Sequence, residues 1–354
     1  MLILLVFYVG VVTMLTRCSM QHGAGQRVVS RCQIVMKNES IHLTIATVCR
    51  NALAYLPACI ESVQPVHQIP GLRVEHLVID GASTDGSVAF LQDELQKGRI
   101  TRLVSEPDKG LYDAMNKAIM QAQGQVIVFI NADDQICPDG VLEVCKPIIE
   151  GEADYVLSAA MLVDEAGRQL GVRGADMSKA LLHMCCCHQA AYCSVDLLRR
   201  LGGFDAENYS LVADADLFTR IYESGARAAV SEAVTCRYYI GGASASVRSE
   251  AELVTMMIRH RESIMHRCRS EKGFAVQAVL NLYRLVRRCL RGQVAPPDEW
   301  CELMSALVAA MPVAEQRRLR TKWWFKYNGL RLKRLITLGR KASPEECLCR
   351  TLLS

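Results

Sequence analysis

Aspartates stand at three places where an apolar run of the sequence meets polar residues. Four of these aspartates are candidate functional residues: Asp80, Asp133, Asp134 and Asp214. An adjacent pair such as Asp133 and Asp134 suits a hard divalent cation, because Mg²⁺ and Mn²⁺ prefer oxygen ligands. An isolated Asp-Asp pair is also typical of a helix N-cap or of an Asx turn before a residue such as Pro138. The interpretation therefore depends on what the fold brings beside the pair.

The runs around these aspartates alternate between two periods. Short β-rich runs predict strands, and apolar residues at helical spacing predict the helices between them. The predicted strands are 41–48, 74–79, 100–104 and 126–130, and the predicted helices begin near Ala52, near Val88 and at Leu111. Alternating strands and helices imply a parallel sheet with right-handed crossovers. Ligands of such sheets bind beyond the carboxyl ends of the strands, which is where the polar clusters stand.

That position gives the carboxylates a chemical interpretation. A nucleoside diphosphate leaving group carries several negative charges, so breaking its bond to a sugar favours a hard cation held by oxygen ligands. Asp133 and Asp134 can place one carboxylate on the metal and the other toward a ribose or the metal shell. Asp214 and Asp216 open a helical pattern two residues apart, so they point in different directions. One can enter a cleft while the other caps the helix.

The segment 106–117 combines a turn with the start of a helix. Lys109 offers a cation near the phosphates, and Asp113 and Lys117 share a helix face through their four-residue spacing. A solvated helix start with surface ion pairs is the alternative, and for Lys117 alone it is equally favoured. For Asp108, Lys109 and Asp113 together we expect a role in binding the donor.

These features occur in order within a longer set of motifs. The stretches are Arg50-Asn51, 78–86, 105–117, 129–134, 187–192, 201–205, 213–217 and 241–244. Together they resemble the inverting family 2 glycosyltransferases of GT-A fold, particularly bacterial polysaccharide enzymes of the colanic-acid and O-antigen type. The resemblance implies an α/β fold with a Rossmann-like, mostly parallel sheet flanked by helices, followed here by a C-terminal helical extension.

The resemblance also implies roles for residues on the donor side. Arg50 matches a donor-binding position, and Asp80 matches the acidic residue near the nucleotide base. Asp133 and Asp134 match the acidic pair that binds Mg²⁺ or Mn²⁺ in the family. Cys49 is a departure, because relatives usually carry an aromatic residue there that stacks on the base. The identity of the base therefore stays open.

On the acceptor side, Asp214 matches the residue that serves as catalytic base. His188 and Gln189 match a site near the sugar or the acceptor, although a core histidine is the ordinary alternative. The implied reaction is a single displacement that moves a sugar from a nucleotide-diphosphate sugar to a saccharide acceptor, with inversion. The Gln-x-x-Arg-Trp motif of processive enzymes is missing, which favours transfer of one sugar each time the acceptor binds.

The main alternative function is an inactive GT-A-like binding protein. A sugar nucleotidyltransferase is a second alternative, and it would need a Gly-rich phosphate loop.

The chain divides into three predicted parts. Residues 1–35 form an apolar N-terminal segment and linker, 36–248 the glycosyltransferase domain, and 249–354 a basic helical region. The apolar run from Leu2 to Leu15 is shorter than a typical spanning helix. Insertion in a membrane and a poorly ordered extension both remain open for it.

The C-terminal region is basic and aromatic. Between Arg317 and Lys341 there is no acidic residue, and Trp323, Trp324 and Phe325 stand among the cations. This pattern favours peripheral contact with an anionic membrane, where a lipid-linked acceptor would lie. A solvated basic helix that packs its aromatics on the catalytic domain is the alternative.

Composition limits the possible partners and the cellular compartment of the protein. A formal net charge of +4 is too small to imply nucleic-acid binding. The 16 cysteines are scattered through apolar segments, which favours reduced thiols in a cytosolic compartment. Cys185, Cys186, Cys187 and His188 could be read as a zinc site, but adjacent residues rarely reach one tetrahedral ion together. We therefore expect a cytoplasmic protein at the inner face of the cell membrane.

Overall fold

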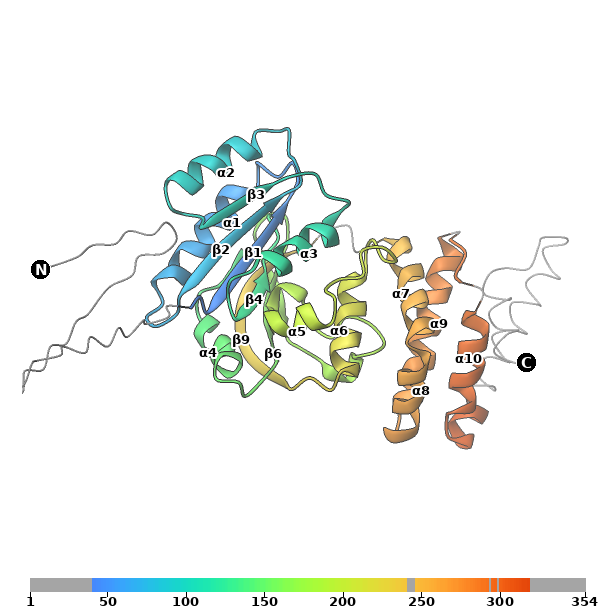
Figure 1. The fold of residues 1–354 in the computed structure, drawn as a ribbon. Helices are drawn as coiled ribbons and strands as arrows, with labels where there is room; N and C mark the ends of the chain where they lie inside the picture. The colour runs from blue at the N-terminus through green and yellow to red at the C-terminus, as the bar shows by residue number, and fades with distance from the viewer. Residues whose placement is uncertain (1–39, 241–245, 293, 298, 319–354) are drawn as a thin grey trace, which may run out of the picture. The chain divides into compact units, whose positions relative to one another are not determined.

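The structure is a computed structural model that describes residues 40–240, 246–292, 294–297 and 299–318 (Figure 1). The predicted N-terminal segment, most of the basic aromatic stretch and the motif at 241–244 lie outside the described residues. The described chain from Ile41 onward belongs to one structural unit.

Nine strands of the described chain form one mixed sheet in the order β3-β2-β1-β4-β8-β6-β9-β5, with β7 paired to β6. Their bounds are β1 Leu43–Cys49, β2 Val74–Asp80, β3 Arg102–Ser105, β4 Val126–Phe129, β5 Gln135–Ile136, β6 Tyr155–Val163, β7 Gln169–Arg173, β8 Ala191–Ser194 and β9 Ala228–Tyr239. The four predicted strands are β1 to β4, and they run parallel. Beyond them β8 is antiparallel to both β4 and β6, while β6 and β9 are parallel. The predicted α/β class is confirmed.

Helices cover both faces of this sheet (Figure 1). Their bounds are α1 Leu56–Val63, α2 Ser87–Gln96, α3 Leu111–Gln121, α4 Val141–Ile149, α5 Val195–Arg200, α6 Ala213–Glu223, α7 Val247–Arg259, α8 Arg261–Ser270, α9 Phe274–Arg291 and α10 Trp300–Ala309. Alternate residues of β1 pack on opposite sides: Ile45 joins the core beneath α1 and α4, and Ala46 joins the core beneath α3. Because both faces are buried, the strands read as continuous apolar runs in the sequence.

Helix α1 begins at Leu56, four residues later than the apolar pattern predicted. The residues from Ala52 to Tyr55 form a turn ahead of it, in which the Ala52 carbonyl accepts the N–H groups of Tyr55 and Leu56. Side chains of the loop after β2 bind the backbone N–H groups at the start of this turn. Asn51 donates to Ser83 Oγ over 2.7 Å, and Leu53 donates to Asp85 Oδ2 over 3.0 Å. Asn51 also has a positive φ of 52°. These bonds join the ends of β1 and β2, which form one rim of the site described below.

The C-terminal helices α7 to α10 share a hydrophobic core with the sheet domain. Val254 and Met257 of α7 belong to the same buried cluster as Leu217 of α6. Asn281 of α9 donates a hydrogen bond to the Leu182 carbonyl over 3.0 Å. The predicted helical extension is thus present, packed on the sheet domain. Across the described residues, no helix combines the length and the apolar composition needed to cross a membrane.

Candidate functional site

A cleft of about 820 Å³ opens at the carboxyl ends of β1 and β4. Among the residues that line it are seven of the predicted site residues: Arg50, Asp108, Asp133, Asp134, His188, Gln189 and Asp214. They come from chain segments up to 164 positions apart (214 − 50), and the crossovers of the sheet bring them together. Asp80, Lys109 and Asp113 do not line the cleft.

Asp134 is held rigidly at the floor of the cleft. Its side chain is 2% exposed, and each carboxylate oxygen accepts a hydrogen bond from a distant segment. Oδ1 accepts the backbone N–H of Tyr239 over 3.0 Å, and Oδ2 accepts Nε2 of Gln189 over 2.7 Å. Burial, aided by the neighbouring charge of Asp133, raises the pKa of Asp134 to about 7. A nearby cation would stabilise its charged form.

Gln189 therefore has a structural contact that the sequence did not predict. We expected it near the sugar or the acceptor; its side chain lines the cleft and is buried against Asp134. Its Oε1 accepts the Cys187 thiol over 2.9 Å, which fixes the amide so that Nε2 faces the carboxylate. Gln189 positions Asp134, and its predicted contact with substrate stays a prediction.

The oxygen groups beside Asp134 fit a hard divalent cation. Asp133 is exposed toward the cleft, and Asn131 Oδ1 is buried without a hydrogen-bond partner in the described chain. Two carboxylates and an amide oxygen are the ligand types that Mg²⁺ and Mn²⁺ prefer. Within the described residues no group of three or more His, Cys, Asp or Glu side chains gathers around one point. Mg²⁺ commonly completes its coordination with substrate phosphates and water.

Asp214 lies on the opposite wall, in the first turn of α6. Its Oδ1 accepts the Tyr112 hydroxyl over 3.1 Å and the backbone N–H of Ala215 over 2.9 Å. Its Oδ2 lies 3.7 Å from Nδ1 of His188. Burial, reinforced by the charge of Asp214, raises the pKa of Tyr112, so this phenol remains a donor. The fixed Oδ1 leaves Oδ2 as the oxygen available to another group in the cleft.

His188 stands between the two acidic groups. Burial lowers the pKa of its imidazole, although Asp214 and Asp133 act in the opposite direction. The ring is thus neutral near pH 7. Its Nε2 is buried without a hydrogen-bond partner in the described chain. A polar atom in that state is costly unless a ligand satisfies it, which supports the predicted placement of His188 beside substrate.

Asp216 takes no part in the cleft. Its side chain is fully buried, and it accepts hydrogen bonds from Arg220 Nε over 2.7 Å and from His260 over 3.0 Å. The expectation that Asp214 and Asp216 point in different directions is met. However, Asp216 joins α6 to the C-terminal helices and does not cap its own helix.

Asp80 is turned into the protein. Its Oδ2 accepts the Ser83 N–H over 3.0 Å and the Ser105 hydroxyl over 2.7 Å, while the Cys49 thiol lies 3.7 Å from Oδ1. The carboxylate thereby holds the loop after β2 against the end of β3. Direct contact between Asp80 and a nucleotide base remains a prediction.

The segment before α3 is bonded mainly to itself. Asp108 Oδ1 accepts the Gly110 N–H, and Asp113 Oδ2 accepts the Lys109 N–H, each over 3.0 Å. Lys117 reaches back to the Pro107 carbonyl over 2.7 Å. Of the three donor-binding residues predicted here, Asp108 lines the cleft and the other two shape the turn that presents it.

Tyr112, Asn131 and Tyr239 are site residues that the sequence did not reveal. The available signal was that Tyr112 and Asn131 stand inside the motif stretches 105–117 and 129–134. Neighbouring positions on a helix face different ways, so Tyr112 is buried while Asp113 is half-buried. The contact of Tyr239 with Asp134 spans 105 positions and depends on the register of β9.

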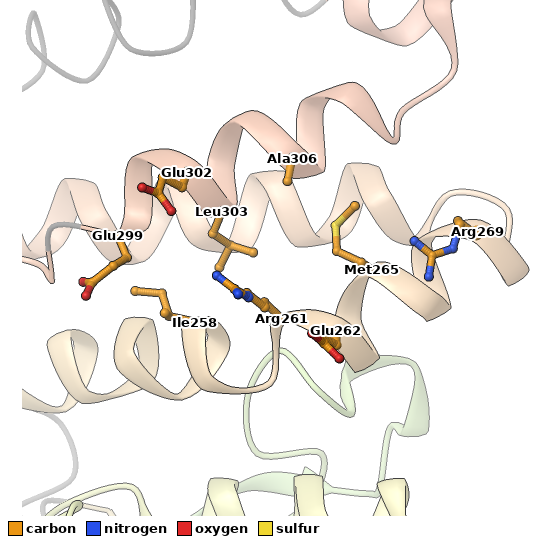
Figure 2. Close-up of a pocket in the computed structure, with 9 residues that line it drawn as sticks. All are labelled: Ile258, Arg261, Glu262, Met265, Arg269, Glu299, Glu302, Leu303 and Ala306. Carbon is orange, nitrogen blue, oxygen red and sulfur yellow. The ribbon is translucent and has the colours of Figure 1, made fainter.

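A smaller cavity of about 520 Å³ lies among α7, α8 and α10, where Figure 2 shows Arg261, Arg269 and Glu302 on its walls. No predicted site residue lines it. It is therefore separate from the cleft that contains the paired aspartates.

Comparison with known proteins places this geometry in a family. Residues 44–193 match the sequence profile described as Glycosyl transferase family 2. An uncharacterized glycosyltransferase of Mycobacterium tuberculosis H37Rv is 30% identical over 199 residues, which covers 55% of this chain and 72% of the relative. A second M. tuberculosis protein, a PGL/p-HBAD biosynthesis glycosyltransferase, is 28% identical over 50% of this chain and 68% of its own length.

Solved structures agree in fold. S. aureus TarS 1-349 in complex with UDP aligns with a TM-score of 0.53 at 14% identity, over 88% of this chain and 90% of TarS 1-349. The same protein in complex with UDP-GlcNAc aligns with a TM-score of 0.51 at 15% identity, over 78% and 82% of the two chains. This likeness confirms the predicted GT-A type of α/β fold. The profile match and the relative covered over 72% of its length show that the chain belongs to glycosyl transferase family 2 and is a glycosyltransferase.

Proposed function

We propose that this glycosyltransferase moves a sugar from a nucleoside-diphosphate sugar to a hydroxyl of a saccharide acceptor, with inversion and with a bound divalent cation. The observation that carries the proposal is that one cleft holds both the Asp133-Asp134 pair and Asp214. The structural neighbour that binds UDP-GlcNAc supports a nucleotide-sugar donor.

The donor would lie against the strand ends, where Asp133 and Asp134 would hold the cation. A cation bound there supplies charge stabilisation to the departing diphosphate. The protein's own contribution is to fix Asp134 through Gln189 and Tyr239, so that little reorganisation accompanies the reaction. Arg50 also lines this part of the cleft and offers a cation to the phosphates.

The acceptor hydroxyl would lie at Asp214. Because Tyr112 and the backbone of Ala215 engage Oδ1, Oδ2 is free to take the proton as the hydroxyl oxygen attacks the anomeric carbon. The new bond joins that oxygen to the anomeric carbon, and the bond from this carbon to the diphosphate oxygen breaks with its electron pair. Attack from the face opposite the leaving group inverts the configuration.

A screen of nucleotide-diphosphate sugars tests the proposal. Purified protein with Mg²⁺ or Mn²⁺ should bind one of them, hydrolyse it slowly, and show no binding after chelation. NMR of the transfer product should show the inverted anomer. The absence of metal-dependent binding and of hydrolysis across the screen would favour an inactive GT-A-like binding protein.

We further propose that the acceptor is a saccharide of the kind used in polysaccharide assembly, such as that of colanic acid or O-antigen, and that it is carried on a lipid. The relative named for PGL/p-HBAD biosynthesis supports a biosynthetic role. The basic aromatic stretch between Arg317 and Lys341 supports peripheral contact with the anionic cytoplasmic face of the membrane.

Removal of residues from Arg317 onward tests the membrane part of this proposal. Full-length protein should cosediment with vesicles containing anionic lipid, and the shortened protein should stay in the supernatant. Both proteins should bind nucleotide equally in the presence of metal. Equal cosedimentation of the two proteins would contradict peripheral binding through this stretch.

A further inference from the structure

The cleft does not end at Asp214 but continues to the C-terminal helices. Beyond the wall that carries Asp214, the cleft is lined by four apolar side chains: Met184, Leu211, Leu253 of α7 and Leu285 of α9. Leu285 is 6% exposed, and the other three are half-buried. Apolar side chains in a cleft that otherwise serves polar sugars and phosphates are unexpected, because a free saccharide offers little apolar surface to them.

This apolar wall is built firmly into the fold. Glu252 of α7 accepts the backbone N–H groups of Ser210 and Leu211, over 3.0 and 2.8 Å, and the Ser210 hydroxyl over 2.6 Å. Asn281 of α9 binds the Leu182 carbonyl two residues before Met184. Glu252 therefore fixes α7 relative to the loop that leads into Asp214, and Asn281 fixes α9 relative to the segment that carries Met184.

The same half of the cleft carries an available cation. The guanidinium of Arg173, at the end of β7, makes no hydrogen bond or ion pair with any described residue, and it lines the cleft. Arg288 at the rim of α9 is already paired with Glu250. His183 is uncharged near neutral pH, because burial lowers its pKa. Of the cations that line this half of the cleft in the described chain, Arg173 is thus the one that a ligand anion can pair with.

We propose that this half of the cleft binds the aglycone of the acceptor, an apolar chain or ring system that carries a phosphate or a carboxylate. The apolar part packs on Leu253 and Leu285, and the anion pairs with Arg173. The sugar hydroxyl is thereby directed to Asp214. This inference rests on the proposed function, because it assigns the acceptor of the same reaction.

Calorimetric titration with n-octyl phosphate, below its critical micelle concentration, tests the inference. The protein is first saturated with Mg²⁺ and whichever of UDP or GDP it binds, so that the donor half is filled. Octyl phosphate should bind, n-octyl glucoside should bind more weakly, and inorganic phosphate should not bind. Leu285→Ser should weaken octyl phosphate binding about tenfold, since the variant loses apolar contact area.

Two matched variants serve as controls. Leu280→Ser changes an exposed leucine of the same helix, and Arg168→Gln removes a cation already paired with Asp164; neither residue lines the cleft. Both variants should bind octyl phosphate like the unaltered protein. Arg173→Gln should weaken octyl phosphate binding several-fold and leave octyl glucoside binding unchanged.

The outcomes separate this inference from the proposed function. Nucleotide-sugar hydrolysis that persists in Leu285→Ser, together with weakened probe binding, supports the aglycone site. If nucleotide-sugar hydrolysis persists but octyl phosphate does not bind, the aglycone site alone is overturned. The same conclusion follows if octyl phosphate binds equally to Leu285→Ser and Leu280→Ser. If the unaltered protein hydrolysed no nucleotide sugar, the proposed function would be contradicted. A parallel titration with 4-octylbenzoate, the anion of 4-octylbenzoic acid, then identifies the anion: tighter binding of 4-octylbenzoate than of octyl phosphate indicates a carboxylate, and the reverse indicates a phosphate.

Discussion

The hydroxyl of Tyr112 donates a hydrogen bond of 3.1 Å to Oδ1 of Asp214, across 102 positions of the chain. The bond joins the first turn of α3 to the first turn of α6. It leaves one oxygen of Asp214 directed by the protein and the other facing the cleft. A base that must meet an acceptor hydroxyl depends on such positioning.

Tyr112→Phe should slow sugar transfer about ten- to hundredfold, because the carboxylate loses a hydrogen bond of the charge-assisted kind. The affinity for the nucleotide should not change, since the donor lies toward the strand ends. Steady-state kinetics and a nucleotide titration measure the two effects. Tyr222→Phe, at a half-exposed position of α6, provides the control. Equal rates for the two variants would show that the bond has no part in transfer.

Asp214→Asn should reduce transfer by roughly a hundred- to ten-thousandfold, because the amide keeps the shape of the side chain but cannot accept the proton. Donor binding should remain. The measurement is turnover at saturating donor, compared with nucleotide affinity by calorimetry. Near-normal turnover would exclude Asp214 as the base.

Asp134→Ala should abolish metal-dependent donor binding, since a hard cation would lose an anionic ligand. Gln189→Ala should weaken that binding less severely, because Asp134 would keep its charge and lose the bond that orients it. Titration of donor nucleotide against Mg²⁺ or Mn²⁺ distinguishes the two variants. Asp139→Ala, at an exposed position nearby, should behave like the unaltered protein. If all three variants kept the same metal dependence, the metal would bind elsewhere.

The sequence predicted the individual strands of the first half of the fold well. For the second half it predicted only the α/β class. Strands β1 to β4 lie within a few residues of their predicted ranges, because both faces of the parallel sheet are buried and leave long apolar runs. The pairing of β6, β8 and β9 follows from long-range register that no local pattern carries. For the site, motif order located Asp134 and Asp214, but not the residues that orient them. The inward turn of Asp80 depends on Ser105 at the end of another strand.

Glu252→Ala should lower the free energy of unfolding by about 1–3 kcal/mol, because three donors on Ser210 and Leu211 would lose one carboxylate acceptor. The loop ahead of α6 should also become less ordered, so transfer should fall while nucleotide affinity holds. Chemical denaturation and kinetics test the two effects. Glu262→Ala on α8 removes an exposed carboxylate as a control. If the Glu252 variant kept its stability and turnover, the hydrogen bonds from Ser210 and Leu211 to Glu252 would not be what holds this loop.

The pair of His260 and Asp216 predicts a pH effect on stability. Burial alone would lower the pKa of His260, but its bonds to Asp216 and Glu223 outweigh burial and raise it. A raised pKa means that this contribution to stability is fully present below about pH 6.5 and is lost as the pH rises through the folded-state value. The stability advantage of the unaltered protein over His260→Gln should thus be larger at pH 6 than at pH 8.5.

Denaturant unfolding at the two pH values measures this difference. His266→Gln, at an exposed position of α8, should show no comparable dependence on pH relative to the unaltered protein. An advantage over His260→Gln that stayed constant with pH would mean that His260 does not gain charge stabilisation on folding.

The carboxylate of Glu252 also limits how this protein can exchange parts with its relatives. A chimera that took only α7 to α10 from a homologue would place a foreign side chain against the backbone of Ser210 and Leu211. Recombination that carries the loop 205–212 together with the helices avoids the mismatch. Active hybrids should therefore have crossover points before residue 205 more often than at the start of α7, so that the loop ahead of Asp214 and its helical support are inherited together.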